Sequence, residues 1–329
     1  LCSFHDPVGW APAWMGRQSD ALRALRHRIR RFFRDRTEAG PSMNRCAVVL
    51  SPHLDDALLS CPGWILERSR NGCIPVVAVP FSERGHGNKE MHCAESAMAT
   101  LGALVRSGGF AHAAARGALF NSYSKQLCQP MDLDTVGHVM AWFHALIDEL
   151  TPSEVLAPLG VDQHVDHRIS HQIAMDLIDK YPRISFSFFE ERPAVYVQEA
   201  IWLRLAHLNM ASHEFESLPM TVRCERFFQS YFGHPATRLQ VRPGDPSPIV
   251  VHWLEVFARG TQSPMATIHG ICSSWPLDLL SDWLVALDSL PSTSCGFIGS
   301  PLYVQWAAVE YAKQLGFLGS YVERSWKLG

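Results

Sequence analysis

Two short segments of the sequence combine histidines and carboxylates in a way that suits metal chemistry. The first reads Ser-Pro-His-Leu-Asp-Asp over residues 51–56, and the second reads Gly-Val-Asp-Gln-His-Val-Asp-His over residues 160–167. Burying this many ionisable side chains without partners is costly, which argues against a role in packing alone. A catalytic zinc ion usually takes three ligands from His, Asp or Glu and keeps one position for water. We therefore interpret the two segments as halves of one metal-dependent hydrolytic centre.

Individual side chains in these segments suit particular roles. The candidate metal ligands are His53, Asp56 and His167. Asp55 adjoins one ligand and is free to take a proton from the attacking water. His164 precedes His167 by about one helical turn and could face the substrate carbonyl from the other side. A structural alternative stays open, because an aspartate at a helix start also caps free amides.

A second metal-ligand arrangement uses His171, four residues after His167. The two histidines would share one face of a helix, so they form a rival pair. We favour His167 alone, because His171 would lie one turn deeper into the helix and farther from the strand end. His/carboxylate sites also bind iron or cobalt, so the residues alone do not fix the metal.

The elements around both segments predict an α/β fold. Predicted strands cover residues 47–50, 74–79, 155–159 and 184–189, and predicted helices cover residues 57–70, 89–101, 134–150 and 167–179. Strands that alternate with helices of this length indicate a Rossmann-like, mostly parallel sheet with helices on both faces. Such sheets bind ligands beyond the carboxyl ends of their strands. Because both segments follow a predicted strand directly, they should meet at one edge of the sheet.

The chain divides into three predicted regions. Residues 1–42 form an N-terminal helical extension, whose arginine-rich part at residues 17–36 carries an amphipathic pattern. Residues 43–242 form the core, and residues 243–329 form a C-terminal extension packed on it. Helical runs are predicted within this extension at residues 275–290 and 303–315.

Composition narrows the classes of partner. The 329 residues carry a net charge of -3, which gives no reason to expect nucleic acid or an anionic membrane as partner. No stretch reaches the ~18 apolar residues of a membrane span. Nine cysteines without a Cys-x-x-Cys pair predict free thiols and a cytoplasmic location. We expect a small-molecule partner, and the oligomeric state cannot be read from these features.

The two segments resemble the motifs of the LmbE-like, or PIG-L, N-deacetylases. The first family motif corresponds to Pro-His-Leu-Asp-Asp at residues 52–56, and the second, His-Pro-Asp-His-like, corresponds to residues 164–167. Softer matches are Glu95 with Leu101-Gly102, and Phe189-Glu190. The resemblance covers roughly residues 45–235. Leu54 and Val165 stand where the family most often has proline, which affects only local backbone stiffness.

The resemblance implies an activity and a set of roles. It implies a zinc-dependent hydrolase that removes an N-acetyl or other N-acyl group from an amino sugar or sugar-containing metabolite, for instance in secondary metabolism. The zinc ligands would be His53, Asp56 and His167. Asp55 would be the general base, and a cationic His164 would stabilise the oxyanion while Asp166 tunes its charge. Two alternatives stay open: an amidase for a thiol conjugate or a longer N-acyl metabolite, and a non-catalytic α/β module that binds a ligand or partner.

Two further places could contact substrate. Glu83 and Arg84 follow the strand at 74–79 in a glycine-rich loop, where binding residues are often found. Glu190 and Arg192 follow the strand at 184–189 and should lie at the same edge of the sheet. A solvated loop is an equally good interpretation at both places.

Overall fold

A computed structural model describes residues 46–83, 88–233, 246–259, 266–277, 280–288 and 301–329. All of them belong to one compact unit, Arg45–Gly329. The predicted N-terminal extension and Arg84 lie outside the described residues. No helix in the described ranges combines the length and the apolar character that a membrane crossing needs.

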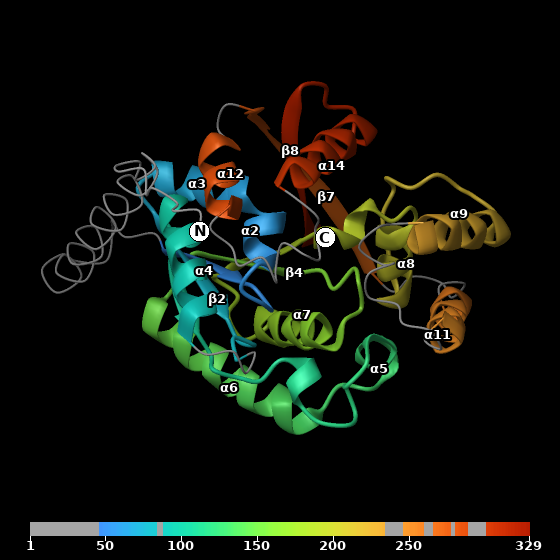
Figure 1. Cartoon of the computed structure of the whole chain (residues 1–329), viewed down its shortest axis with the longest axis horizontal. Coiled ribbons are helices and arrows are strands. Elements are labelled where there is room, and N and C mark those ends of the chain that lie inside the picture. Colours follow the sequence, from blue (N-terminus) through green and yellow to red (C-terminus); the bar gives the residue numbers. More distant parts are fainter. Residues whose placement is uncertain (1–45, 84–87, 234–245, 260–265, 278–279, 289–300) are drawn as a thin grey trace, which may run out of the picture. The chain divides into compact units, whose positions relative to one another are not determined.

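The described chain alternates between strands and helices, as Figure 1 shows. The strands are β1 (Cys46–Leu50), β2 (Ile74–Val79), β3 (Leu104–Ser107), β4 (Glu154–Pro158), β5 (Ser185–Phe189), β6 (Met210–Ala211), β7 (Ala266–Pro276) and β8 (Ser320–Leu328). The helices in the first part are α2 (Asp56–Ser60), α3 (Pro62–Arg70), α4 (Asn88–Thr100), α5 (Tyr123–Cys128), α6 (Leu133–Leu150) and α7 (Val165–Ile178). The later helices are α8 (Ala200–His207), α9 (Met220–Gly233), α11 (Pro246–Arg259), α12 (Leu280–Asp288) and α14 (Pro301–Gln314). Short 3-10 turns occur at Ala113–Ala115 and Ala194–Tyr196.

The strands form one eight-stranded sheet in the order β3-β2-β1-β4-β5-β8-β7-β6. The pairs from β3 to β5 are all parallel, while β8 is antiparallel to both β5 and β7. From β1 the chain moves outward to β2 and β3, and it later returns to the other side of β1 as β4. This reversal is the topological switch point, where sheets of this kind bind ligands. The α/β fold predicted from the sequence is therefore confirmed.

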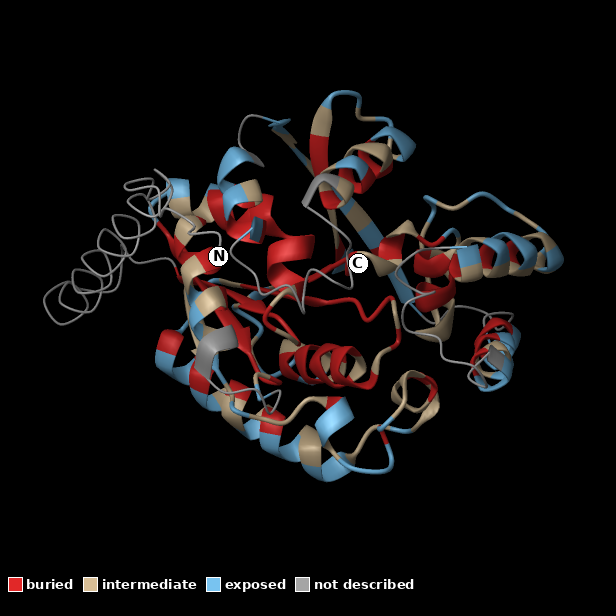
Figure 2. Cartoon of the chain, viewed as in Figure 1, coloured by how far each residue is buried: buried red, intermediate tan, exposed pale blue. Residues whose placement is uncertain are grey.

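The side chains of the central strands alternate between the two faces of the sheet, and both faces are buried. Ala47, Val49, Val77 and Val79 share one core cluster with residues of α2, α3, α4 and α12. Their neighbours in sequence point to the opposite face, because successive side chains of a strand alternate, and α7 packs there against β4. Figure 2 shows β1, β2, β4 and most of α7 as buried. Helices thus cover both faces, which explains why these strands are continuously apolar.

Helix boundaries agree with the sequence prediction where the hydrophobic period is regular. The elements predicted between residues 74 and 189 agree with the structure to within two residues at each end. The single helix predicted over residues 57–70 is divided into α2 and α3 at Cys61, because Pro62 has no N–H to continue it. The Glu323 carboxylate accepts hydrogen bonds from the N–H groups of Gly63 and Trp64 at 2.6 and 2.9 Å, which caps α3.

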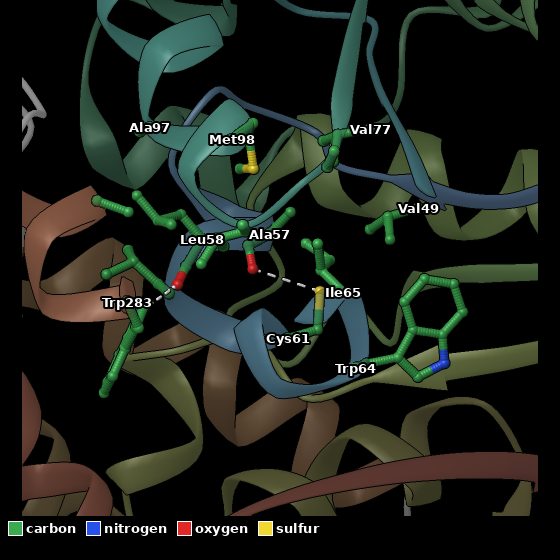
Figure 3. Packing of buried hydrophobic residues seen from close by; sticks show 14 of the residues in the cluster. Val49, Ala57, Leu58, Cys61, Trp64, Ile65, Val77, Ala97, Met98 and Trp283 are labelled. Carbon is green, nitrogen blue, oxygen red and sulfur yellow. Dashed lines mark hydrogen bonds between the residues drawn. The ribbon is translucent and has the colours of Figure 1, made fainter. Parts of the chain in front are cut away.

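The C-terminal segment contributes to the sheet as well as to its cover. Strands β7 and β8 extend the sheet beyond β5. The helix predicted over residues 275–290 is wrong at its start, because Trp275 pairs with Tyr321 in the β7–β8 ladder and α12 begins only at Leu280. The helix predicted over residues 303–315 is confirmed as α14. Figure 3 shows how α12 packs on α2: the Trp283 indole donates to the Leu58 carbonyl at 2.7 Å.

Candidate metal centre

The loop after β1 is held by its own polar side chains. The fully buried Ser51 hydroxyl donates to the His53 carbonyl at 2.6 Å and accepts from the Ala57 N–H at 3.0 Å. The Asp56 carboxylate accepts from the His53 N–H at 2.8 Å. Because these bonds close the loop onto the start of α2, the side chains of His53 and Asp56 lie side by side.

The loop after β4 is held from the neighbouring strand. The Glu191 carboxylate, just beyond β5, accepts from the N–H groups of Gly160 and Val161, the latter at 3.1 Å. Gly160 has φ +79°, a left-handed conformation that favours glycine. The Asp162 carboxylate then accepts from the His164 N–H at 3.0 Å, directly before α7. The loop therefore delivers the first turn of α7 to the end of β1.

Three ligand atoms from the two loops meet in a nearly equilateral triangle. His53 Nδ1 lies 3.3 Å from Asp56 Oδ2, and His167 Nε2 lies 3.3 Å from the same oxygen. The two ring nitrogens are also 3.3 Å apart. Asp56 and His167 are buried and His53 is half-buried. The structure thus brings together the three side chains that sequence analysis selected as metal ligands.

The triangle has the dimensions of a zinc site. Ligand atoms about 2.0–2.1 Å from a tetrahedral ion lie about 3.3–3.4 Å from one another. Two imidazole nitrogens and one carboxylate oxygen are also the ligand types that catalytic zinc prefers. Other carboxylate and imidazole groups lie close by, since ligand atoms of Asp55 and His164 also come within 4.8 Å of His53. The three side chains, which come from the two loops, therefore fit a zinc ion bound between them.

The far nitrogen of each imidazole faces a carboxylate. His53 Nε2 donates to Asp166 Oδ2 at 2.9 Å. His167 Nδ1 lies 3.2 Å from Asp162 Oδ1 and 3.6 Å from Glu191 Oε1. A carboxylate behind a ligating histidine fixes the ring orientation and raises the basicity of the nitrogen that faces the metal. This arrangement supports the assignment of both histidines as ligands.

Electrostatic interactions in the triangle favour the charged forms of His53, Asp56 and His167. Burial alone would lower the pKa of His53, but Asp166 and Asp56 outweigh it and raise that pKa. In the same way Asp162 and Asp56 raise the pKa of His167 against its burial. Burial opposes ionisation of Asp56, yet the two imidazoles hold its pKa well below the usual range. A divalent cation would replace the protons of the two rings, so metal binding should release protons.

His164 differs in charge from the expectation. Burial and the positive fields of His53 and His167 lower its pKa to about 4, although Asp166 acts in the opposite direction. Its Nδ1 accepts from the Asp166 N–H at 3.3 Å, and its Nε2 lies 3.2 Å from Gln126 Oε1. The lowered pKa and these contacts favour a neutral ring with its N–H at Nε2, in contrast to the cationic His164 expected from the resemblance.

Asp166 mainly contacts a different histidine from the one expected. Besides the bond to His53, its carboxylate accepts from the Ala113 N–H at 3.0 Å, and its Oδ1 forms an ion pair with Arg116 Nη1 at 2.7 Å. Burial opposes its ionisation, but His53, His164 and Arg116 together hold its pKa far below the usual range. Asp166 acts on His164 only through its field and its backbone. Its side chain instead orients a candidate metal ligand.

Several residues at this site were not found from the sequence. They are His112, Arg116, Gln126, Asp162 and Glu191. The His112 ring stacks on His53 with centroids 4.4 Å apart and planes inclined by 12°. Arg116 lies over the rings of Phe81 and Phe120 while it holds Asp166. Asp162 and Glu191 adjoin predicted residues, but no spacing pointed to the segment from 112 to 126.

The residues predicted to contact substrate fall into two groups. Glu83 is exposed, and its backbone pairs with the segment that carries His112, so it lies beside the site. Glu190 and Arg192 are 3% and 5% exposed and bind residues of the C-terminal segment. The Glu190 carboxylate accepts from Tyr311, from Arg324 at 2.6 Å and from Trp326 at 2.9 Å. These contacts make Glu190 and Arg192 structural residues, which corrects the expectation for them.

The rival ligand His171 points away from the triangle. Its Nδ1 donates to the Pro158 carbonyl at 3.0 Å, and its ring packs on Phe188 with centroids 4.9 Å apart. Among the described residues, none of the His/Cys/Asp/Glu groups close enough to share an ion includes His171. Among these residues His171 therefore does not share a group of neighbouring ligand atoms with His167.

Comparison with known proteins gives matches at the level of fold. No protein-family model and no curated protein matches the sequence. Solved structures of deacetylases are similar in fold. The A40926 pseudoaglycone deacetylase Dbv21 has a TM-score of 0.55 and 15% identity, over 87% of this chain and 97% of that chain. The deacetylase–teicoplanin complex has a TM-score of 0.54 and 15% identity, over 86% and 98%. The zinc-inhibited teicoplanin deacetylase Orf2 has a TM-score of 0.53 and 14% identity, over 86% and 98%.

Proposed function

We propose that this protein is a zinc-dependent amide hydrolase of the LmbE-like type, which removes an N-acetyl or other N-acyl group from a sugar-containing small molecule. The observation that carries the proposal is the triangle of His53 Nδ1, Asp56 Oδ2 and His167 Nε2, with each edge at 3.3 Å. The fold shared with solved deacetylases supports it.

The bound ion would supply the electrophilic part of the chemistry. Zinc in such a site polarises the amide carbonyl and lowers the pKa of water to about 7. Asp55 is the residue proposed to accept the proton of the attacking water. It is half-buried at the start of α2, and one of its oxygens lies within 4.8 Å of ligand atoms of His53 and Asp56. General-base assistance of this kind contributes roughly 10²–10⁴-fold to the rate.

His164 is proposed to act on the substrate oxygen, and the proton that Asp55 accepts from water is proposed to pass to the leaving nitrogen. His164 Nε2 carries the ring N–H and lies 3.2 Å from Gln126 Oε1. A neutral N–H donor can stabilise the oxyanion that develops as water adds to the carbonyl. When the oxyanion forms, that donor exchanges Gln126 for the substrate oxygen. Loss of one such donor costs about 10²–10³ in rate.

The similar structures support a proposed substrate class. One of them is a complex with teicoplanin, and another is a pseudoaglycone deacetylase. We propose an N-acylated amino sugar, free or attached to a larger metabolite. Glu83, which lies beside the site, is a candidate substrate contact, and Arg84 stays one from the sequence alone.

Release of acetate from a panel of N-acetyl amino sugars and their conjugates tests this function. The test compares zinc-loaded, chelator-treated and zinc-restored protein. Activity should disappear when zinc is removed and return when it is restored. Asp55→Asn should retain zinc, but its rate should fall by about 10²–10⁴-fold. Full activity in metal-free protein would refute the proposal, as would an unchanged rate in Asp55→Asn.

A further inference from the structure

A pair of tyrosines beside the metal centre has no part in the proposed reaction. Tyr123 lies in the first turn of α5, and Tyr231 lies near the end of α9. Their hydroxyl oxygens are 3.5 Å apart, and Tyr231 is the donor of this hydrogen bond. A phenol carries one O–H hydrogen besides its acceptor lone pairs. Because Tyr123 accepts from Tyr231, its own hydrogen stays available for another acceptor.

Helix α5 places Tyr123 on the side of the metal centre. Gln126 follows Tyr123 by three residues, so the two side chains lie on the same face of the helix. The Gln126 amide reaches the metal centre, since its Oε1 lies 3.2 Å from His164 Nε2. Its Nε2 donates to the Phe120 carbonyl at 2.9 Å, which fixes the orientation of the amide. Tyr123 therefore lies about one helical turn from the residue that meets His164.

Electrostatic interactions connect both phenols to the loop after β4. Burial and the neighbouring Tyr231 raise the pKa of Tyr123, and Asp162 adds to this rise. Burial raises the pKa of Tyr231 to about 12, and Asp162 acts in the same direction. The Asp162 carboxylate itself lies 3.2 Å from His167 Nδ1. The two phenols thus lie within the field of a residue of the metal centre, and at neutral pH they keep their hydrogens.

Tyr231 supports Tyr123 from a packed aromatic cluster. Tyr231 is 5% exposed, and its ring stacks on Phe227 with centroids 5.3 Å apart and planes inclined by 21°. Trp253 of α11 packs on the same ring in a T-shaped arrangement, with centroids 5.7 Å apart. Helix α11 packs on both α5 and α9. Packing therefore fixes Tyr231, whereas the half-buried Tyr123 is the member of the pair that a ligand can reach.

The chemistry of Tyr123 says what kind of group it fits. In the proposed reaction the zinc ion and His164 act on the acyl carbonyl, which leaves the part of the substrate beyond the amide nitrogen for neighbouring side chains. In an amino sugar that part carries hydroxyl and ring oxygens close to the nitrogen. Such oxygens are uncharged acceptors, and a neutral phenol hydrogen is a suitable donor for them.

We propose that Tyr123 is a substrate-binding residue that donates a hydrogen bond to a sugar oxygen next to the acylated nitrogen. This inference rests on the proposed function and sharpens its substrate class, because it requires oxygen acceptors on the amine side of the amide. The bond is made to a part of the substrate that does not react. Its loss should therefore raise KM and leave kcat nearly unchanged.

Ligand binding to the zinc-loaded Asp55→Asn protein tests the inference, because hydrolysis should not consume the ligand there. The probes are N-acetylglucosamine and N-cyclohexylacetamide, whose ring has the same size but carries no oxygen. Adding Tyr123→Phe should weaken the binding of N-acetylglucosamine by about threefold to tenfold, which is the scale of one hydrogen bond. The affinity for N-cyclohexylacetamide should stay the same. Titrations followed by NMR measure both affinities.

Two matched tyrosine variants in the same background serve as controls. Tyr181→Phe removes a hydroxyl that makes an exposed contact, where it donates to Asp148 at 2.7 Å, and it should not change either affinity. Tyr231→Phe removes only the supporting donor, so it should weaken the binding of N-acetylglucosamine less than Tyr123→Phe does. Retained zinc and a retained circular-dichroism spectrum show that each variant is folded.

Several results would overturn the role of Tyr123. They are the absence of saturable N-acetylglucosamine binding in the Asp55→Asn protein, an unchanged affinity after Tyr123→Phe, and an equal loss for N-cyclohexylacetamide. An equal loss in Tyr181→Phe, or a larger one in Tyr231→Phe, would also overturn it. Because these affinities are measured without turnover, a failure here is distinct from a failure of the proposed hydrolysis, which the zinc-dependent release of acetate tests.

Discussion

Glu190 and Glu191 are neighbours at the end of β5, yet they belong to two different buried polar clusters. Glu190 faces the C-terminal segment, where Tyr311, Arg324 and Trp326 donate to it. Glu191 faces the loop after β4, where its carboxylate accepts from two backbone N–H groups. Its Oε1 also lies 3.6 Å from His167 Nδ1, the ring nitrogen outside the triangle. Adjacent residues of identical type thus serve architecture on one side and the candidate site on the other.

The two clusters differ in what their polar atoms point at. In the Glu190 network every contact given above ends on another group of the chain, as expected for buried polar groups that stabilise a fold. In the metal centre three ligand atoms converge on one another at 3.3 Å, and carboxylates support the histidines from behind. Residue types alone do not separate these cases. The convergence of ligand atoms is what marks a binding site.

The largest expected effect comes from removing one corner of the triangle. Asp56→Asn keeps the size of the side chain but removes the charge that two imidazoles share. Metal affinity should fall by more than the 10–100-fold that loss of a supporting residue costs, and hydrolysis should fall with it. Metal analysis after dialysis and a rate assay would show this. Full zinc occupancy in Asp56→Asn would exclude Asp56 as a ligand.

Glu190→Gln should weaken the fold while it spares the metal. Loss of one partner of a buried ion pair costs about 3–5 kcal/mol. Among the described residues, Arg324 then keeps only Glu214, which is partially exposed, as an ion-pair partner. We expect the unfolding free energy from urea titration to drop by about 3 kcal/mol, with zinc content unchanged. A drop in zinc affinity without a stability change would reverse our assignment of the two clusters.

Glu191→Gln should produce the opposite pattern and a smaller effect. The amide can still accept hydrogen bonds from the backbone of the β4 loop, but it no longer places a negative charge behind His167. Zinc affinity should fall by about 10–100-fold, because supporting residues contribute on this scale. A competition titration with a chelator measures the change. Equal zinc affinities for Glu190→Gln and Glu191→Gln would remove the distinction drawn between them.

The smallest effect concerns two histidines on α7 with opposite shifts. Burial lowers the pKa of His171 to about 3 from an ordinary value near 6.5, whereas the pKa of His167 is raised. Between pH 3 and about 6.5, His171 is protonated in the unfolded chain and neutral in the folded chain. The free energy of unfolding therefore falls as the pH falls from about 6.5 toward 3. This group should contribute about 1 kcal/mol of the loss between pH 7 and pH 5.5.

Urea titrations at both pH values, in buffers without phosphate, check the His171 contribution. His171→Gln should lose less stability on acidification than the wild type, by that amount. His144→Gln should follow the wild type. An unchanged pH dependence in His171→Gln would mean that the ring is not held in its neutral form.

Much of the candidate metal centre could be predicted because its candidate ligands lie in segments that follow strands. His53 and His167 lie just beyond β1 and β4, and parallel strands place such loops at one edge. The supporting residues could not be predicted in this way. His112 and Arg116 reach the site through a loop after β3, and Glu191 reaches it because β5 lies beside β4. Those neighbours follow from strand order, which a local pattern does not contain.

The least predictable part of the fold was the C-terminal segment. Trp275 begins an apolar run that suits a helix, but its strand is determined by pairing with Tyr321, far along the chain. Glu190 and Arg192 were misjudged for the same reason, since the groups that bury them come from α14 and β8. Short-range periodicity identifies elements, while distant pairing decides which polar residues remain accessible.

X-ray absorption at the zinc edge of the purified protein tests the central claim most directly. Our account predicts about one zinc per chain with two imidazole nitrogens at about 2.0–2.1 Å and carboxylate or water oxygens at about 2.0–2.2 Å, and loss of this signal in His53→Ala. Sulfur ligands at about 2.3 Å, or an unaltered signal in His53→Ala, would contradict it.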